Sequence, residues 1–199
     1  LYQNYVAWTE RTGTRMDKLF LCDLTTMETT TLHMFSNTSY GQSLPSLMDG
    51  VLVWADAERT GSTDEEDVSV IYSVRLGSTS IQSIHTETYA HDPISNGQYT
   101  AWLDAHHSPQ AKLYCMAQGA SEPAPVAEGV VQFGMGNKFI AYSKDETIYL
   151  YRFDNKKTYK LSGEYEKAQF MGVSDGKVIW MDVTSRERDI LKYSEVPER

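Results

Sequence analysis

The sequence predicts an all-β fold built from repeated four-stranded antiparallel sheets. Three observations predict it: a short strand motif that recurs five times, a turn signal in front of most copies, and no useful stretch with the 3.6-residue periodicity of an amphipathic helix. The composition agrees, because the 199 residues are 41% hydrophobic and 23% charged, as in ordinary globular proteins. A chain of this length can bury a large hydrophobic core.

The recurring motif is an apolar run, an aromatic ring, a small residue and, in most copies, an acid. All four tryptophans and one tyrosine occupy its aromatic position, called the aromatic slot below. The copies lie at residues 5–10, 51–56, 99–104, 139–144 and 178–182, with the slot residues Trp8, Trp54, Trp102, Tyr142 and Trp180. They follow one another at about 40 to 50 residues, a period that indicates a repeat architecture.

Turn signals and further strands flank each slot strand. Asp-Gly or Asn-Gly precedes three copies, and these dipeptides favour hairpin turns because both central positions need a positive φ. A second β-rich run with an aromatic follows each copy, and a Thr/Ser/Lys-rich run follows most. Each repeat therefore reads as an inner strand, the slot strand, a third strand and an outer strand. The first repeat begins at its slot strand and the last ends after its third strand, so both should form incomplete sheets.

A four-stranded sheet repeated at this period is typical of a β-propeller blade. One twisted sheet cannot bury both of its faces, so neighbouring blades must stack, with the slot rings between them. We expect residues 1–199 to form a single β-propeller domain. Five blades are favoured, because a ring that is cut open exposes sheet faces and edges. The alternative is a fragment of a six- to eight-bladed propeller.

Two copies carry a resemblance to a known family: Ser95-Asn96-Gly97-Gln98-Tyr99-Thr100-Ala101-Trp102 and Ser174-Asp175-Gly176-Lys177-Val178-Ile179-Trp180. Both resemble the TolB-like bacterial β-propeller repeat, and the resemblance extends over nearly the whole chain. It implies an extracytoplasmic protein of the bacterial cell envelope that acts mainly as an interaction scaffold. Lys144, in place of the acid, and the degenerate turn Gly134-Met135-Gly136 depart from the pattern. Because the chain begins at Leu1, we expect any leader or anchor to be absent from it.

Charge and cysteine content exclude several classes of partner. The 18 Lys and Arg against 27 Asp and Glu give a net charge of −9, which repels nucleic acids and anionic membranes. The longest apolar runs are far shorter than the roughly 20 residues of a membrane span, so we expect no membrane insertion by this segment. Cys22 and Cys115 match no metal or redox spacing and are expected to be unpaired thiols on strands. We expect no metal and no cofactor.

The inner strands supply the candidate binding residues, since they would line the central funnel of a propeller. We expect these strands near residues 42–48, 89–95, 130–135 and 168–174. The candidates are His91, Asp92, Gln132 and Gln169, together with the loop residues His106 and His107. Hydrolysis of a glycosidic bond needs two carboxyl groups, and Asp92 has no visible second carboxylate on these strands.

The predicted function is therefore a non-enzymatic scaffold that binds a protein or a cell-wall glycan through its loop face. The alternative is a carbohydrate-active enzyme or a glycan-binding propeller with its site in the central funnel. Four acids follow the slot at equivalent positions: Glu10, Asp56, Asp104 and Asp182. We expect them to be structural and to accept backbone N–H groups.

Overall fold

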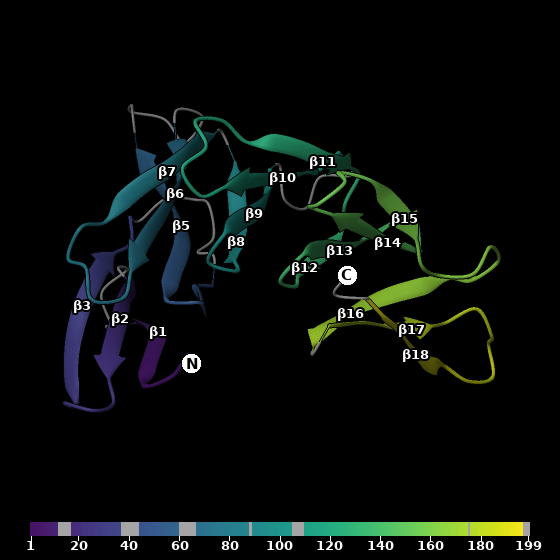
Figure 1. Ribbon diagram of the computed structural model, residues 1–199, viewed down its shortest axis with the longest axis horizontal. Helices are drawn as coiled ribbons and strands as arrows, with labels where there is room; N and C mark the ends of the chain where they lie inside the picture. Colours follow the sequence, from purple (N-terminus) through teal and green to yellow (C-terminus); the bar gives the residue numbers. More distant parts are fainter. Residues whose placement is uncertain are drawn as a thin grey trace. The chain divides into compact units, whose positions relative to one another are not determined.

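The computed structural model describes residues 1–11, 17–36, 44–59, 67–87, 89–104, 110–174 and 176–196. Every regular element in these ranges is a β-strand, which confirms the all-β prediction (Figure 1). None of the described residues forms a helix that could cross a membrane. The chain divides into two compact units, one of Leu1–His106 with Tyr114–Ala124 and one of His107–Leu113 with Pro125–Arg199.

The strands form five antiparallel sheets in chain order. The first sheet holds β1 (Tyr5–Arg11), β2 (Asp17–Asp23) and β3 (Glu28–Met34). The second holds β4 (Ser46–Met48), β5 (Val51–Arg59), β6 (Asp67–Arg75) and β7 (Gln82–Glu87). The third holds β8 (Ala90–Ser95), β9 (Tyr99–Asp104), β10 (Lys112–Ala117) and β11 (Ala124–Glu128). The fourth holds β12 (Gln132–Met135), β13 (Phe139–Lys144), β14 (Thr147–Arg152) and β15 (Thr158–Lys160). The fifth holds β16 (Ala168–Ser174), β17 (Lys177–Asp182) and β18 (Ile190–Glu195).

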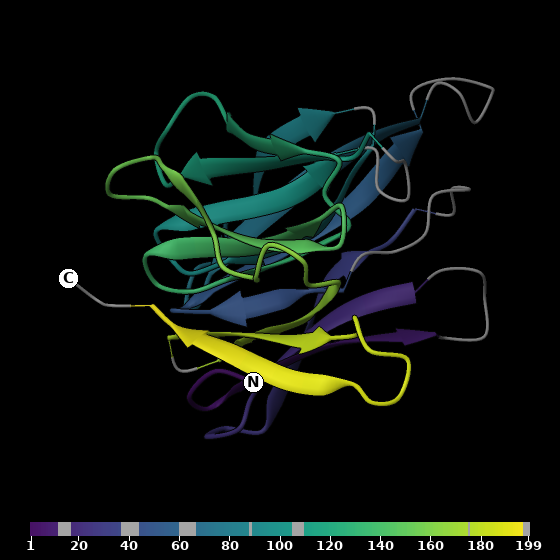
Figure 2. The same ribbon diagram turned by 90° about the vertical axis from the view of Figure 1, so that its right-hand side faces the viewer.

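The first and last sheets are incomplete in the predicted way. The sheet β1-β2-β3 lacks the inner strand, and the sheet β16-β17-β18 lacks the outer one. The other three have the predicted order of inner strand, slot strand, third strand and outer strand. Within the second unit, the views of Figures 1 and 2 both place the sheet β16–β18 against the sheet β12–β15.

Three of the slot residues, Trp54, Trp102 and Trp180, pack against the preceding sheet. Trp54 is fully buried in a cluster with Leu19 and Phe35, which belong to the first sheet or directly follow it. Trp102 packs with Ala55 and Ile71 of the second sheet, and Trp180 packs with residues of the fourth sheet. Successive side chains of a strand point to opposite faces. On β5, Trp54 therefore faces the first sheet, whereas the adjacent Ala55 packs with Ala90 and Trp102 of the third sheet.

A second ring stacks on the slot ring in four of the five sheets. The pairs are Trp8–Phe20, Trp54–Tyr72, Trp102–Tyr114 and Tyr142–Tyr149, with ring centroids 5.3, 5.6, 6.1 and 5.4 Å apart and interplanar angles of 21 to 23°. In the fifth sheet Lys192 lies opposite Trp180. Cross-strand aromatic pairs of this kind stabilise a sheet by up to about 1 kcal/mol each.

The turn prediction is confirmed at one hairpin and wrong in detail at another. Asp49 and Gly50 both have positive φ angles, 48° and 72°. At Asn96-Gly97 only the glycine does, because the Asn96 side chain instead accepts the N–H groups of Gln98 and Tyr99. Gly134 was expected in a turn, but it lies within β12. Asp175 lies outside the described residues.

The predicted structural role of the repeated acids is confirmed for two of them. Asp56 accepts the N–H groups of Ser36 and Ala57 at 3.0 and 2.8 Å, and Asp182 accepts the N–H of Thr184 at 3.1 Å. The cysteines are unpaired and buried, Cys22 on β2 and Cys115 on β10. Burial raises the pKa of the Cys115 thiol to about 12, so it is an unreactive thiol at neutral pH.

Candidate functional site

The second unit contains a groove of about 650 Å³ between β12–β13 and β16. Gln132 of β12 and Gln169 of β16, both predicted as binding residues, line it together. Ser143, Lys144 and Glu146 add polar groups, and Val131, Phe170 and Met171 add apolar surface. The volume lies within the range of about 300 to 1,000 Å³ that is usual for small-molecule sites.

The groove lies between the inner strands of two neighbouring sheets, β12 and β16. β12 and β16 are the edge strands of their sheets. The register of β16 shifts between Phe170 and Gly172, so Met171 has no partner on β17. Such bulges redirect a side chain and are common beside functional sites. Met171 is accordingly 57% exposed at the groove, and Val131 is 66% exposed.

Gly134 allows the two strands to approach closely. A Cβ atom at this position would lie 3.1 Å from the ring of Phe170 and 3.2 Å from a methyl carbon of Val173. A side chain there would require the Phe170 ring and the Val173 side chain to shift by a few tenths of an ångström. The glycine that departs from the repeat pattern therefore leaves room for Phe170, one of the residues that line the groove.

The charges around the groove are unevenly paired. Glu146 forms an ion pair with Lys167, with 3.3 Å between Oε2 and Nζ. Lys144 makes no ion pair with any residue that the structure describes. Backbone bonds hold the rim, since the Ala168 N–H donates to the Glu146 carbonyl at 2.7 Å. The groove thus presents an available ammonium group beside two carboxamides.

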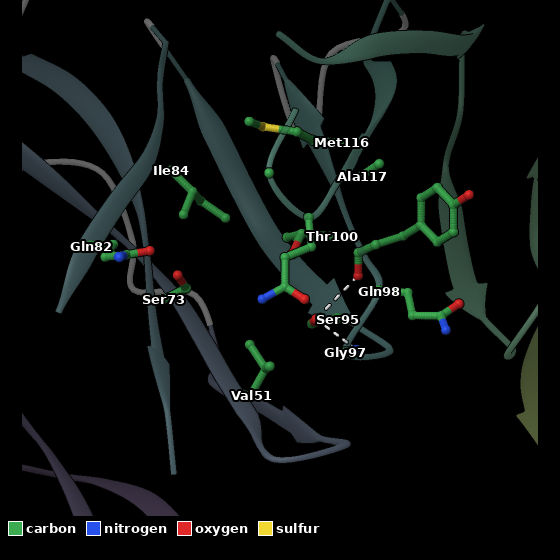
Figure 3. Close-up of a pocket in the computed structure, with 13 residues that line it drawn as sticks. Val51, Ser73, Gln82, Ile84, Ser95, Gly97, Gln98, Thr100, Met116 and Ala117 are labelled. Atoms are coloured by element: carbon green, nitrogen blue, oxygen red, sulfur yellow. Dashed lines mark hydrogen bonds between the residues drawn. The ribbon is translucent and has the colours of Figure 1, made fainter. Parts of the chain in front are cut away.

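A smaller pocket of about 100 Å³ lies in the first unit, between the second and third sheets. Figure 3 shows Val51 and Ile84 on one side of it and Thr100 and Met116 on the other. Ser95 lies at its edge and uses its hydroxyl in two local hydrogen bonds. The hydroxyl donates to the Tyr99 carbonyl and accepts the Gly97 N–H, both at 3.1 Å. This pocket is smaller than typical ligand sites, which have volumes of about 300 to 1,000 Å³.

The remaining predicted site residues do not line the groove or lie outside the described residues. His91 and Asp92 lie together on β8, with Nδ1 and Oδ1 3.0 Å apart. Asp92 has a φ of +49° at an irregularity in the pairing of β8 with β9. His106 and His107 lie outside the described residues. His91 and Asp92 belong to the first unit, whereas Gln132 and Gln169 belong to the second.

A charged cluster that sequence reasoning missed stabilises the fifth sheet. The Lys192 ammonium donates to Asp182 at 2.8 Å and also to Glu166. Asp182 further accepts the Thr184 hydroxyl at 2.6 Å. These bonds, that of Lys192 first, lower the pKa of Asp182 to about 2, and Lys192 likewise lowers the pKa of Glu166. The signal in the sequence was a lysine at the position where the other four repeats have an aromatic.

A histidine–carboxylate pair in the first unit packs against the hydrophobic core and has a structural role. His33 Nε2 lies 2.7 Å from Asp56 Oδ2, and the His33 ring packs on Trp54 and Tyr72. The Asp56 side chain is only 5% exposed and already accepts two backbone N–H groups, those of Ser36 and Ala57. Within the described ranges, no three His, Cys, Asp or Glu side chains are grouped so that they could hold a metal ion.

The comparisons with known proteins support one fold. No protein-family model matches the chain, and no curated protein matches its sequence. Among solved structures, TolB from Acinetobacter baumannii matches with a TM-score of 0.61 and 14% identity, over 96% of this chain and 50% of that one. The β-propeller domain of the Trilobed protease from Pyrococcus furiosus matches with a TM-score of 0.69 and 10% identity, over 100% of this chain and 68% of that one. The fold is that of a TolB-like β-propeller.

Peptidases form a further group of similar structures. A structure from a study of two prolyl endopeptidases matches with a TM-score of 0.73 and 10% identity, over 97% of this chain. The chain spans 32% of the length of that structure and 50% of the TolB structure. At these identities the likeness establishes the fold, and the function must be argued from the site.

Proposed function

We propose that this TolB-like propeller chain is a non-enzymatic, extracytoplasmic scaffold that binds a protein or a cell-wall glycan. The observation that carries the proposal is the groove of the second unit, which Gln132 and Gln169 line together with exposed Val131 and Met171. The TolB-like fold supports an envelope location.

The groove has the mixed chemistry of a recognition site. A carboxamide both donates and accepts hydrogen bonds, so Gln132 and Gln169 can pair with a peptide backbone or with sugar hydroxyls. Exposed apolar side chains such as Val131 and Met171 favour contact with a partner over contact with water. A concave surface with a few polar groups among apolar ones is the usual composition of a binding site.

The proposal can be tested by measuring whether the chain binds peptides or glycans on arrays. The chain is applied to an array of short random-sequence peptides and to an array of bacterial cell-wall glycans. We expect reproducible binding on one of the two, and its loss in the double variant Gln132→Ala/Gln169→Ala. The matched control is Gln82→Ala/Gln118→Ala, which removes two carboxamides from the smaller pocket. Binding that the control abolishes and the groove variant retains would contradict the site, and no binding on either array would contradict the function.

A second candidate function follows from the peptidase matches. The chain would then be the propeller part of a larger peptidase, as it covers 32%, 37% and 38% of three peptidase structures. Peptide-hydrolysing activity of the full gene product, with none in this chain, would support that candidate. The carbohydrate-active alternative predicts glycoside cleavage that Asp92→Asn abolishes, and equal activity of both proteins would remove it.

A further inference from the structure

We propose that the groove binds a short peptide that carries an apolar side chain and a free carboxylate, with Lys144 as the residue that binds the carboxylate. This inference rests on the proposed function, because it names the class of ligand for the same groove. It is carried by the position of Lys144, by the pairing of the charges around it, and by the apolar surface beside it.

Lys144 reverses the charge of its position in the repeat. The other four copies have Glu10, Asp56, Asp104 or Asp182 after the slot. The carboxylates of Asp56 and Asp182 accept backbone N–H groups and so have a structural role. An ammonium group cannot accept a hydrogen bond, so Lys144 cannot take that role. The fourth repeat has therefore exchanged a structural acid for a cation that lines the groove.

The ammonium of Lys144 is available to a ligand. Glu146, the acid among the residues that line the groove, is already paired with Lys167. Lys144 has no ion-pair partner among the residues that the structure describes, although the chain as a whole has nine more acids than bases. A lysine ammonium can bind a carboxylate through a charge-assisted hydrogen bond.

The surroundings of Lys144 favour a peptide over an acidic sugar. Val131, Phe170 and Met171 offer contact to an apolar side chain, which a uronic acid does not have. Gln132 and Gln169 can accept from and donate to the amide groups of an extended peptide. The groove of about 650 Å³ has room for a few residues.

The test compares two peptides that differ only in their terminal charge. Acetyl-Ala-Ala-Leu with a free carboxylate and its C-terminal amide are titrated calorimetrically into the chain. We expect the free acid to bind at least about tenfold more tightly than the amide, because a hydrogen bond to a charged group contributes about 1.5 to 3 kcal/mol. Lys144→Ala should weaken binding of the acid to the level of the amide and leave the amide unchanged.

Two further variants control for folding and for general charge. Lys144→Asp restores the acid of the other repeats, so it should fold normally and bind the free acid more weakly than Lys144→Ala does. Lys160→Ala removes an exposed lysine of β15 in the same unit and should change nothing. Melting temperature and circular dichroism establish that each variant is folded.

Three results would overturn the inference. Equal affinity for the acid and the amide would show that the groove does not recognise a carboxylate. The proposed scaffold function would still stand if the groove variant Gln132→Ala/Gln169→Ala no longer bound either peptide. An equal effect of Lys144→Ala and Lys160→Ala would show a general charge effect. Binding of a galacturonic acid trimer, with dependence on Lys144 and no binding of either peptide, would assign the groove to an acidic sugar instead.

Discussion

Replacing Trp54 by alanine tests whether the slot rings hold neighbouring sheets together. Trp54 is 0% exposed and packs between the first and second sheets, against Leu19, Phe35 and Val74. Trp8 occupies the same slot in the first sheet and stacks on Phe20 in the same way, but it is only half-buried. The two tryptophans belong to the same compact unit, so Trp8→Ala is the matched control.

The expected losses can be worked from burial. A tryptophan buries up to about 200 Å² of mostly apolar surface, which corresponds to about 5 kcal/mol at 25 cal/mol per Å². The alanine methyl group recovers part of this, and a cavity costs more, so Trp54→Ala should lower the free energy of unfolding by about 3 to 5 kcal/mol. Trp8 hides a smaller area, and Trp8→Ala should cost about 2 kcal/mol.

Urea unfolding followed by circular dichroism measures both losses, with the slope against urea checked for each variant. The midpoint for Trp54→Ala should fall well below that for Trp8→Ala. If the two substitutions destabilise the protein equally, Trp54 does not hold two sheets together. The inference that a ring in the aromatic slot stabilises the packing between neighbouring sheets would then be wrong.

Three further perturbations act on the turns and the charges. Gly97→Ala should destabilise the chain by more than about 2 kcal/mol in urea melts, since φ is +82° and a Cβ would lie 2.6 Å from that of Asp49. Gly50→Ala, at φ +72° with open space, should cost only about 1 kcal/mol, and equal losses would refute the clash. The lowered pKa of Asp182 means that its ionised form stabilises the fold above about pH 4, and that this is lost as pH falls towards about 2. The difference in the free energy of unfolding between wild type and Asp182→Asn should therefore be constant from pH 7 to 5 and shrink by pH 3. A difference that grows in acid would contradict a stabilising role of the ionised carboxylate. Lys192→Met should raise the pKa of Asp182 in a carboxyl NMR titration, and an unchanged pKa would exclude the ion pair as the cause.

The repeat made most of the fold predictable. Five aromatic rings at one motif position indicated equivalent packing, and the missing first and last strands could be read from where Tyr5 and Tyr193 stand in the motif. Turn geometry was less predictable, because the Asn96 side chain competes with the backbone conformation that Asn-Gly usually adopts. Lys192 shows why local pattern was insufficient: its partner Glu166 is 26 residues distant and comes from a connecting segment.

The candidate site was predictable only in part. Three inner strands were placed within two residues, which identified Gln132 and Gln169, whereas the one expected at residues 42–48 is only Ser46–Met48 in the described ranges. A strand assignment also does not say which sheet edges lie beside one another. Met171 reaches the groove through a change of register, which no periodic pattern reveals. Lys144 was visible as a break in the repeat, and its significance depends on Glu146 being paired elsewhere.

Methyl-resolved NMR locates the ligand most directly, because each pocket contains one valine and one methionine. Val131 and Met171 line the groove, and Val51 and Met116 line the smaller pocket. With acetyl-Ala-Ala-Leu as the titrant, the methyl signals of Val131 and Met171 should shift in proportion to saturation, while those of Val51 and Met116 stay in place. Shifts at Val51 and Met116 alone, or no shift at any of the four, would contradict binding in the groove.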